Sequence, residues 1–246
     1  DPWHVTEIGR LATPGQAYDV VVEGGLAWVA DGTGGVTTAD VTDPAAPVVV
    51  GNAWEAGNVR GVTLRPGQAV VTDAFYGIHL VDVQNPADPF LLGRLELPGG
   101  PMETDISADH AFVCCGDSGM RVVDLSDPAR PQEVGALATV ARHVALAGDL
   151  ACVVASHEDL RVVDVSDPPN PVIVGVCALP EYSFGVATEG SYAYVACLSG
   201  GLQIVDLADP AHPVVCGQYL HPGGIYDVIV HKGLAYLSIR GWGHIA

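Results

Sequence analysis

The chain has 246 residues, 49% of them hydrophobic, and its 29 aspartates and glutamates outnumber its 10 lysines and arginines, which gives a formal net charge of -19. The length fits one large domain or two small ones, and the apolar content excludes general disorder. Nucleic acid and anionic lipid surfaces are excluded as partners, because their phosphates would be repelled. No apolar run reaches the ~18 residues of a membrane-spanning helix, so we expect no membrane insertion.

The first residues, Asp1-Pro2-Trp3, include no initiator methionine and no basic or apolar leader. We interpret the chain as a mature or excised piece whose targeting signal has been removed. The cysteines show no Cys-x-x-Cys spacing and are predicted to be buried thiols, with one or two disulfides as the alternative. They are Cys114, Cys115, Cys152, Cys177, Cys197 and Cys216.

A repeat of about 42 residues organises the chain. Its aspartates are spaced 42, 42, 40 and 42 residues apart: Asp40, Asp82, Asp124, Asp164 and Asp206. A turn dipeptide follows each of them: Asp43-Pro44, Asn85-Pro86, Asp127-Pro128, Asp167-Pro168 and Asp209-Pro210. A short apolar strand then ends in a glycine: Gly51, Gly93, Gly135, Gly175 and Gly217. One period before the first unit lie Asp1-Pro2 and Gly9, so the register already runs at residue 1.

Each unit is predicted to hold four short strands. In the first unit they are Tyr18–Val22, Leu26–Ala30, Val36–Val41 and Val48–Val50, separated by Gly-rich or Asp-Pro turns. Several strands are apolar at successive positions, which favours a sheet covered on both faces. A four-stranded unit of this length is typical of a β-propeller blade.

Six first strands can be counted, and they begin near Tyr18, Arg60, Met102, Arg142, Phe184 and Tyr226. The sixth unit runs out inside its third strand, at residues 243–246, whereas Trp3 to Ile8 has the pattern of an outermost strand with no unit before it. Pairing that strand with the last unit would close the ring and remove its open edges. The predicted fold is therefore all-β: a single six-bladed β-propeller over residues 1–246, with four-stranded blades, closed by the N-terminal strand that completes the last blade. The alternative is a segment of a longer array with further blades on either side.

Three segments carry a resemblance to a known family: Met120-Arg121-Val122-Val123-Asp124, Leu160-Arg161-Val162-Val163-Asp164 and Leu202-Gln203-Ile204-Val205-Asp206. Each is followed by an x-Asp-Pro turn, and together they resemble the LVIVD repeat. The resemblance covers nearly the full length, in five of six units, with departures at Ala39 and Asn85. The LVIVD-repeat family occurs mainly in bacterial and archaeal secreted or cell-surface proteins. The resemblance therefore implies a propeller in an extracellular, cell-surface or periplasmic setting, but no particular activity.

Three motifs are interpreted as turns rather than as sites. The repeated aspartates would suit calcium, but an Asp before a tight turn accepts backbone N–H groups, which every repeat needs. The segment 116–119, Gly-Asp-Ser-Gly, has the sequence around a serine-protease nucleophile, yet it aligns with the glycine-rich turn 32–35. His157-Glu158 lacks the second histidine of a zinc-protease helix and lies in the equivalent turn of the fourth unit.

A candidate site arises where the units differ from one another. The second residue of the first strand reads Asp19, Gly61, Glu103, His143, Gly185 and Asp227. In a propeller these positions crowd the mouth of the central channel, on the face that also carries two further groups of residues. The turns contribute Asp73, Phe75, Tyr76, Asp117, His157 and Trp242, and the connections contribute Trp54, Glu55, Glu181, Tyr182 and His221. Carboxylates, imidazoles, guanidinium groups and aromatic rings in one concave place are typical of a small-molecule site, with a solvated rim as the alternative.

We expect a non-enzymatic binding or interaction scaffold whose protein or carbohydrate ligand binds at the channel mouth. The ligand-binding candidates are Asp19, Arg60, Glu103, Arg142, His143, Asp227, Tyr18, Tyr226 and His157. The alternative is a polysaccharide lyase or glycosidase with Glu103, His143, Asp19 and Asp227 as acid/base groups. We expect these four side chains to converge within about 10 Å of the channel axis, where their charges would attract a cation or a polar ligand. No cofactor is required. Calcium is the metal that the carboxylates would suit, and zinc would need His143 with His157 or His221.

Overall fold

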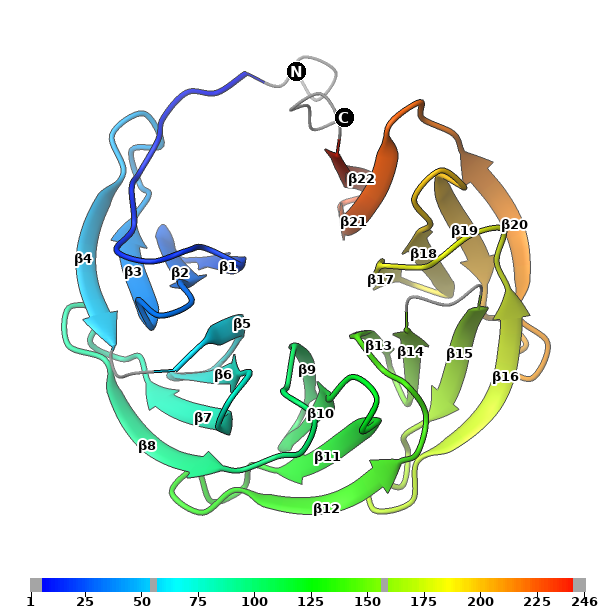
Figure 1. Ribbon diagram of the computed structural model, residues 1–246, viewed down its shortest axis with the longest axis horizontal. Helices are drawn as coiled ribbons and strands as arrows, with labels where there is room; N and C mark the ends of the chain where they lie inside the picture. Colours follow the sequence, from blue (N-terminus) through cyan, green and yellow to red (C-terminus); the bar gives the residue numbers. More distant parts are fainter. Residues whose placement is uncertain (1–5, 54–56, 156–158, 241–246) are drawn as a thin grey trace. The chain divides into compact units, whose positions relative to one another are not determined.

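The computed structural model describes residues 6–53, 57–155 and 159–240. Within these ranges the chain contains 22 β-strands and no helix. The strands form five four-stranded antiparallel sheets and one two-stranded sheet, and within each sheet the strands are paired in chain order (Figure 1). In the described part of the chain, no helix is long and apolar enough to cross a membrane. The prediction of an all-β repeat fold is confirmed.

The first three sheets comprise β1 (Asp19–Glu23), β2 (Leu26–Ala30), β3 (Val36–Asp40) and β4 (Val48–Ala53); β5 (Val59–Arg65), β6 (Gln68–Asp73), β7 (Gly77–Asp82) and β8 (Phe90–Leu95); and β9 (Glu103–Ser107), β10 (His110–Cys114), β11 (Met120–Asp124) and β12 (Gln132–Leu137). The last three comprise β13 (His143–Ala147), β14 (Leu150–Val154), β15 (Asp159–Asp164) and β16 (Val172–Ala178); β17 (Gly185–Glu189), β18 (Tyr192–Ala196), β19 (Leu202–Asp206) and β20 (Val214–Tyr219); and β21 (Gly224–His231) with β22 (Leu234–Arg240). The six predicted first strands correspond to β1, β5, β9, β13, β17 and β21.

The described residues fall into two compact units. The N-terminal unit holds residues 6–115 and 121–134, and the C-terminal unit holds residues 116–120 and 135–240. First strands of successive sheets contact one another: β1 with β5 and β5 with β9 in the N-terminal unit, β13 with β17 and β17 with β21 in the C-terminal unit. Because strands alternate in direction, the turn after the second strand and the connection to the next sheet lie where the first strand begins. We call this the leading end of a sheet.

The five repeated aspartates stabilise turns at the opposite end. Each accepts, through Oδ1, the backbone N–H of the residue two positions later at 2.8–2.9 Å. The donors are Thr42, Gln84, Ser126, Ser166 and Ala208. In the turn dipeptide that follows, Asp43 accepts the Ala45 N–H at 3.0 Å, and Asn85 keeps the same bond with its amide oxygen. These bonds fix how the chain leaves the third strand, as the sequence analysis predicted.

The repeated glycine of the fourth strand makes room for the Asp-Pro turn of the following sheet. A Cβ atom on Gly51 would lie 2.2 Å from the carbonyl oxygen of Pro86, and one on Gly175 would lie 2.0 Å from that of Pro210. The same contact joins Gly93 to Pro128 and Gly135 to Pro168. Only glycine lets two backbones approach this closely. The turn of one sheet therefore packs onto the outer strand of the sheet before it.

All six cysteines are free thiols, and five of them are buried. Burial raises the pKa of Cys115, Cys152 and Cys197 to about 12. These thiols therefore stay protonated and pack as small apolar residues in the core. The prediction of buried thiols is confirmed for all but Cys216, which is exposed.

The prediction that the apolar runs are covered on both faces is wrong for two strands of the first sheet. Val20 and Val22 of β1 are 53% and 60% exposed, and Val48 of β4 is 59% exposed. By contrast, Val70 and Val71 of β6 are fully buried. A fourth strand lies at the edge of its sheet, away from the core, and β1 belongs to the first sheet of the unit.

The predicted closure of the ring falls mainly outside the described residues. Of the proposed closing strand, residues 1–5, including Trp3, lie outside them, and residues 6–8 are not in a strand. Residues 241–246, where the sequence predicts the third strand of the last unit, also lie outside them. The last sheet as described consists of β21 and β22.

Asp164→Ala should lower the thermal midpoint by about 2–4 °C, because the turn loses its side-chain acceptor. The pKa of Asp164 is lowered because the Ser166 hydroxyl and backbone N–H donate to its carboxylate. A carboxyl whose pKa is lower in the folded chain stabilises the fold above its unfolded pKa, and this contribution is lost as the pH falls through the folded pKa. The difference in midpoint between wild type and variant should therefore shrink as the pH is lowered from 7 to about 3. Calorimetric melting measures it, with Asp149→Ala in an exposed turn as the control, and a difference that does not change with pH would contradict the assignment.

Candidate functional site

The predicted site residues lie at the leading ends of the sheets, divided between the two units. Tyr18, Asp19, Arg60 and Glu103 belong to the N-terminal unit, and Arg142, His143, Tyr226 and Asp227 belong to the C-terminal unit. His157, Trp54, Glu55 and Trp242 lie outside the described residues. Each group is therefore described within its own unit, and the convergence of Glu103, His143, Asp19 and Asp227 stays a prediction.

In the N-terminal unit, the Asp19 carboxylate joins two neighbouring first strands. Its Oδ1 accepts the N–H of Val20 at 2.7 Å, and its Oδ2 accepts the N–H of Val62 on β5 at 3.0 Å. A Cβ atom on Gly61 would lie 3.7 Å from this Oδ2. The carboxylate is solvent-exposed, yet each of its oxygens accepts a backbone N–H. Gly61 holds the equivalent position in the next sheet, and a Cβ atom there would thus be in van der Waals contact with this carboxylate.

Tyr18 and Arg60 form a cation–π pair beside that carboxylate. The guanidinium carbon of Arg60 lies 4.1 Å from the centroid of the Tyr18 ring. With its side-chain amide oriented so that the oxygen faces Arg60, Asn58 accepts from Nη2 at 2.9 Å and from Nε at 3.2 Å. Sequence analysis placed Tyr18, Asp19 and Arg60 in one site, and the structure brings these three together.

A buried carboxylate holds the next turn. Asp73 is fully buried, and its Oδ1 accepts the N–H groups of Phe75 and Tyr76 at 2.8 and 3.2 Å. Its Oδ2 accepts the N–H of Asn58 at 3.1 Å. This turn displays both aromatic side chains, which are 71% and 46% exposed. A chain of contacts therefore runs from the Tyr18 ring to the Tyr76 backbone.

Asp31 is the equivalent buried carboxylate of the first sheet. Sequence analysis placed Asp73 among the turn residues of the site but missed Asp31. Asp31 is fully buried and accepts from the Thr13 hydroxyl at 2.6 Å and from the Gly15 N–H at 2.8 Å. The repeat alignment contains a signal for this role, because the residue nine positions before the repeated aspartate is acidic in two units and apolar in the others. It reads Asp31, Asp73, Cys115, Ala155 and Cys197. An acidic residue among apolar equivalents marks a sheet that fixes its leading end differently.

Glu103, the third candidate of the N-terminal unit, lies at the start of β9, where it pairs across the sheet with Cys114. Burial first, and then the charge of Glu103, raise the pKa of that thiol. The neighbouring Met102 carbonyl accepts the Thr72 hydroxyl at 2.9 Å, which ties β9 to the sheet before it. Glu103 is therefore half-buried at a contact between sheets.

In the C-terminal unit, an aromatic pair and a carboxylate–glycine pair lie side by side. The rings of Phe184 and Tyr226 are 5.4 Å apart between centroids and tilted by 53°. A Cβ atom on Gly185 would lie 2.3 Å from Asp227 Oδ1, which accepts the N–H of Val228 at 2.8 Å. This arrangement parallels Tyr18, Arg60, Asp19 and Gly61 of the other unit. Of these two glycines, only Gly185 makes room for a carboxylate, because a Cβ atom on Gly61 would come closest to the Thr72 hydroxyl and the Met102 carbonyl, at 2.8 and 3.0 Å.

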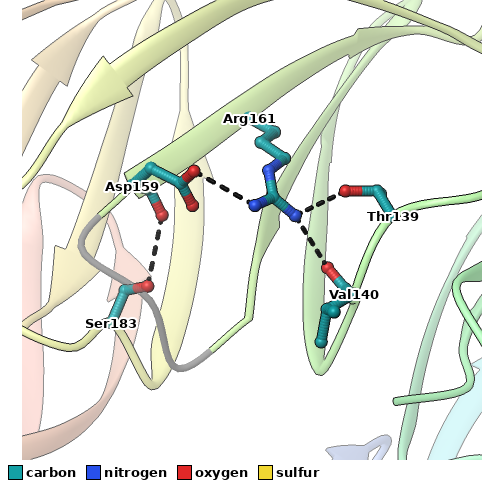
Figure 2. A network of polar contacts seen from close by, with 5 residues as sticks. All are labelled: Thr139, Val140, Asp159, Arg161 and Ser183. Carbon is teal, nitrogen blue, oxygen red and sulfur yellow. Dashed lines mark hydrogen bonds and ion pairs between the residues drawn. The ribbon is translucent and has the colours of Figure 1, made fainter. Parts of the chain in front are cut away.

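Arg161 organises the remaining polar contacts of this unit (Figure 2). Its Nη1 donates to the Thr139 hydroxyl and to the Val140 carbonyl, the latter at 3.1 Å, and its Nη2 lies 3.1 Å from Asp159 Oδ2. The Ser183 hydroxyl donates to the Asp159 carbonyl at 3.3 Å. The guanidinium group thereby fixes the connection that leads into β13, the first strand of its own sheet.

Arg142 and His143 follow directly on that connection. The guanidinium group of Arg142 lies 3.9 Å from the carboxylate of Asp117, which is 89% exposed, so this ion pair is weak. Sequence analysis missed Arg161, although the residue three positions before the repeated aspartate is polar in all five units. The residues at this position are Thr37, His79, Arg121, Arg161 and Gln203.

The carboxylates at the leading ends are thus engaged as hydrogen-bond acceptors within the sheets. Asp19, Asp31 and Asp73 each accept two or more hydrogen bonds. Among residues 6–53, 57–155 and 159–240, no three His, Cys, Asp or Glu side chains form a group that could hold a metal ion. Exposed aromatic rings held by these polar contacts, together with charged groups such as Asp117, form the surface left for a ligand.

Comparison with known proteins supports the repeat assignment. The LVIVD repeat pattern matches residues 14–53, 98–139, 140–178 and 182–221. No curated protein matches the chain.

Solved structures resemble the chain only at low sequence identity. A functionally unknown protein from Desulfotomaculum acetoxidans superposes with a TM-score of 0.77 at 12% identity, covering 96% of this chain and 84% of that one. Hydrazine synthase from Kuenenia stuttgartiensis gives 0.77 at 14% identity, covering 98% and 79%. The computationally designed Ika8 protein gives 0.71 at 9% identity, covering 91% and 68%. At such identities the likeness concerns the fold alone, that of β-propeller-like repeat proteins.

Arg161→Leu should destabilise the protein by about 2–3 kcal/mol, because Thr139, Val140 and Asp159 lose the group that bonds them. The Arg161 side chain is only 17% exposed, so water replaces little of this loss. Urea unfolding measures the change, and hydrogen exchange over residues 138–143 should become faster. The matched control is Arg130→Leu, whose side chain is 82% exposed in its pair with Asp127 and should change stability by less than about 0.5 kcal/mol. If the two substitutions lower the free energy of unfolding equally, Arg161 does not anchor the connection.

Proposed function

This chain belongs to the LVIVD repeat family, and from that premise we propose that it is a six-bladed β-propeller that works as a binding module outside the cell or at its surface. The ligand or partner binds at the leading ends of the blades. The N-terminal segment completes the last blade and closes the ring. The setting rests on the family resemblance, and the binding role rests on the leading ends described above.

Two exposed faces support the closure. Val62, Val144 and Val186 occupy one repeat position and are buried, at 3%, 3% and 7% exposure, whereas Val20 at the same position is 53% exposed. At another repeat position Trp28 is buried, whereas Tyr236 of the last sheet is 39% exposed. The first and last sheets thus each present an uncovered apolar face. Packing these faces together would bury both, as the family fold requires.

The glycine contacts support it as well. A Cβ atom on Gly9 would lie 2.0 Å from the Pro44 carbonyl, the contact that Gly51 makes with Pro86. This contact supports the proposal that the residues around Gly9 act as the outer strand that precedes the first sheet. At the other end, the atoms of the described residues that lie nearest a Cβ atom on Gly217 belong to the Ile204 side chain, the first at 3.3 Å. In the repeat register the turn that would cover Gly217 is Asp1-Pro2.

Gly217→Ala tests this closure. If the Asp1-Pro2 turn packs on Gly217, the substitution should cost about 2–4 kcal/mol, as much as Gly175→Ala, because a methyl group would clash with backbone in both places. Urea unfolding of the two variants and the wild type provides the comparison. A cost below about 1 kcal/mol for Gly217→Ala alone would mean that only Ile204 is displaced, and the ring closed by the N-terminus would be wrong in favour of a longer array.

One observation carries the choice of binding over catalysis. The leading ends display exposed aromatic rings on backbone that buried or hydrogen-bonded carboxylates hold in place, and Asp19 already accepts two backbone N–H groups. A general acid or base must offer its carboxyl to a substrate. Rigid aromatic side chains with polar neighbours suit recognition of a protein or a carbohydrate. The polysaccharide lyase or glycosidase remains the second candidate, through Glu103 and His143.

The experiment has two parts. The protein is screened for binding to arrayed oligosaccharides, and calorimetry measures its binding of calcium and zinc. Tyr18→Ala and Phe184→Ala at the leading ends should each weaken a ligand at least about tenfold. Tyr192→Ala is the matched control, because this ring is 40% exposed at the opposite end of its sheet. A ligand that all three variants bind like wild type would place the site elsewhere. Time-dependent release of sugar products that requires Glu103 and His143 would establish the enzyme instead.

A further inference from the structure

The turn between β6 and β7 differs from the equivalent turns that the structure describes. It presents Phe75 and Tyr76 to solvent while fully buried Asp73 bonds the backbone N–H of both. The equivalent turns have the sequences Gly-Thr-Gly-Gly at 32–35, Gly-Asp-Ser-Gly at 116–119 and Leu-Ser-Gly-Gly at 198–201. No repeat requirement therefore explains two adjacent aromatic residues here. Exposed rings also gain nothing from the core, so they serve something outside the unit.

The two exposed rings offer aromatic surface to a cation. Their planes meet at 81° in an edge-on arrangement, and their centroids lie 6.4 Å apart. A cation that comes within ~6 Å of the centroid over an exposed ring face is attracted by that ring. We propose that the corner between Phe75 and Tyr76 binds a lysine or arginine side chain of a basic partner protein. This inference rests on the proposed function, whose partner class it specifies.

The charges around the corner favour a cation as well. The Asp73 carboxylate lies directly beneath the turn and is bonded to backbone N–H groups. Burial lowers the pKa of His79, so this neighbour of Asp73 does not offset the negative charge at neutral pH. The whole chain carries a formal charge of -19, which steers a basic partner towards it. The same unit already pairs a guanidinium group with an aromatic ring, where Arg60 covers Tyr18 at 4.1 Å.

The openness of the corner favours a protein over a small molecule. Small ligands are held in sites that bury roughly 70–90% of their surface, whereas Phe75 and Tyr76 are 71% and 46% exposed. A partner protein can cover both rings and exclude water around them. Rigid aromatic residues beside complementary charge are the groups that dominate binding energy in such interfaces.

The test uses an octalysine peptide as the probe and the full chain in titration calorimetry, at moderate salt. Phe75→Leu and Tyr76→Leu keep an apolar side chain but remove the aromatic face. Each should weaken octalysine about tenfold, the factor that ~1.4 kcal/mol makes in a dissociation constant. Phe90→Leu is the matched control, because Phe90 is 56% exposed on β8 of the same unit. It should leave binding unchanged. Thermal melting of all three variants should equal that of wild type, since the replaced rings are exposed.

Two outcomes would overturn the proposal. If Phe75→Leu and Tyr76→Leu bind octalysine as wild type does, the peptide binds only through attraction to the net charge of the protein. If Phe90→Leu weakens binding equally, the corner has no special role. The proposed function is tested separately. If an oligosaccharide binds and depends on Tyr18 or Phe184, the chain is still a binding module even when the Phe75–Tyr76 corner does not bind a cation. A chain in which no leading-end substitution affects any ligand would remove both.

Discussion

The close approach of each Asp-Pro turn to the glycine of the preceding outer strand is the contact on which the repeat depends. It requires glycine on one side, because a Cβ atom on Gly51 or Gly175 would lie 2.0–2.2 Å from a carbonyl oxygen. It requires a turn of fixed shape on the other side, which the paired aspartates provide by accepting backbone N–H groups. Strand, turn and glycine therefore recur together, and none of the three can change without loss of packing between sheets.

This contact lies at one end of the sheets and leaves the other end free to vary. At the leading end, each sheet solves the same problem with different residues. Asp73 holds its turn and Asp31 holds the segment before β1, each with a buried carboxylate, whereas Arg161 holds a connection with a guanidinium group. Cys115 and Cys197 fill the equivalent space with thiols that donate to carbonyls of the strands they follow. The packing between sheets fixes the residues at the end of the Asp-Pro turns, whereas the residues at the leading end differ from sheet to sheet. A binding surface is expected where variety does not cost the fold its packing.

Most of the fold could be predicted because the repeat is read five times. The position of every first strand, the turn role of Asp40 to Asp206 and the buried thiols followed from period and spacing alone. The exposure of Val20 and Val48 did not, because an apolar run does not say which sheet has a neighbour. The candidate site was predicted in part. Tyr18, Asp19 and Arg60 do meet, but the sequence could not show that Asp19 is occupied by the Val62 N–H, since that bond joins residues of different sheets.

The use of carboxylates distinguishes this chain from what its composition suggests. An excess of acidic groups invites a search for acid/base pairs or calcium, yet the aspartates named above accept hydrogen bonds from backbone N–H groups. Their charge is not cancelled by these bonds, because an N–H donor is neutral. Negative charge is thus built into the turns for structural reasons and persists at the surface those turns display. Where such a turn also carries exposed rings, as Asp73 carries Phe75 and Tyr76, a structural device acquires the electrostatics of a cation-binding surface. Recognition would then have arisen from a turn that was already needed to hold the sheet.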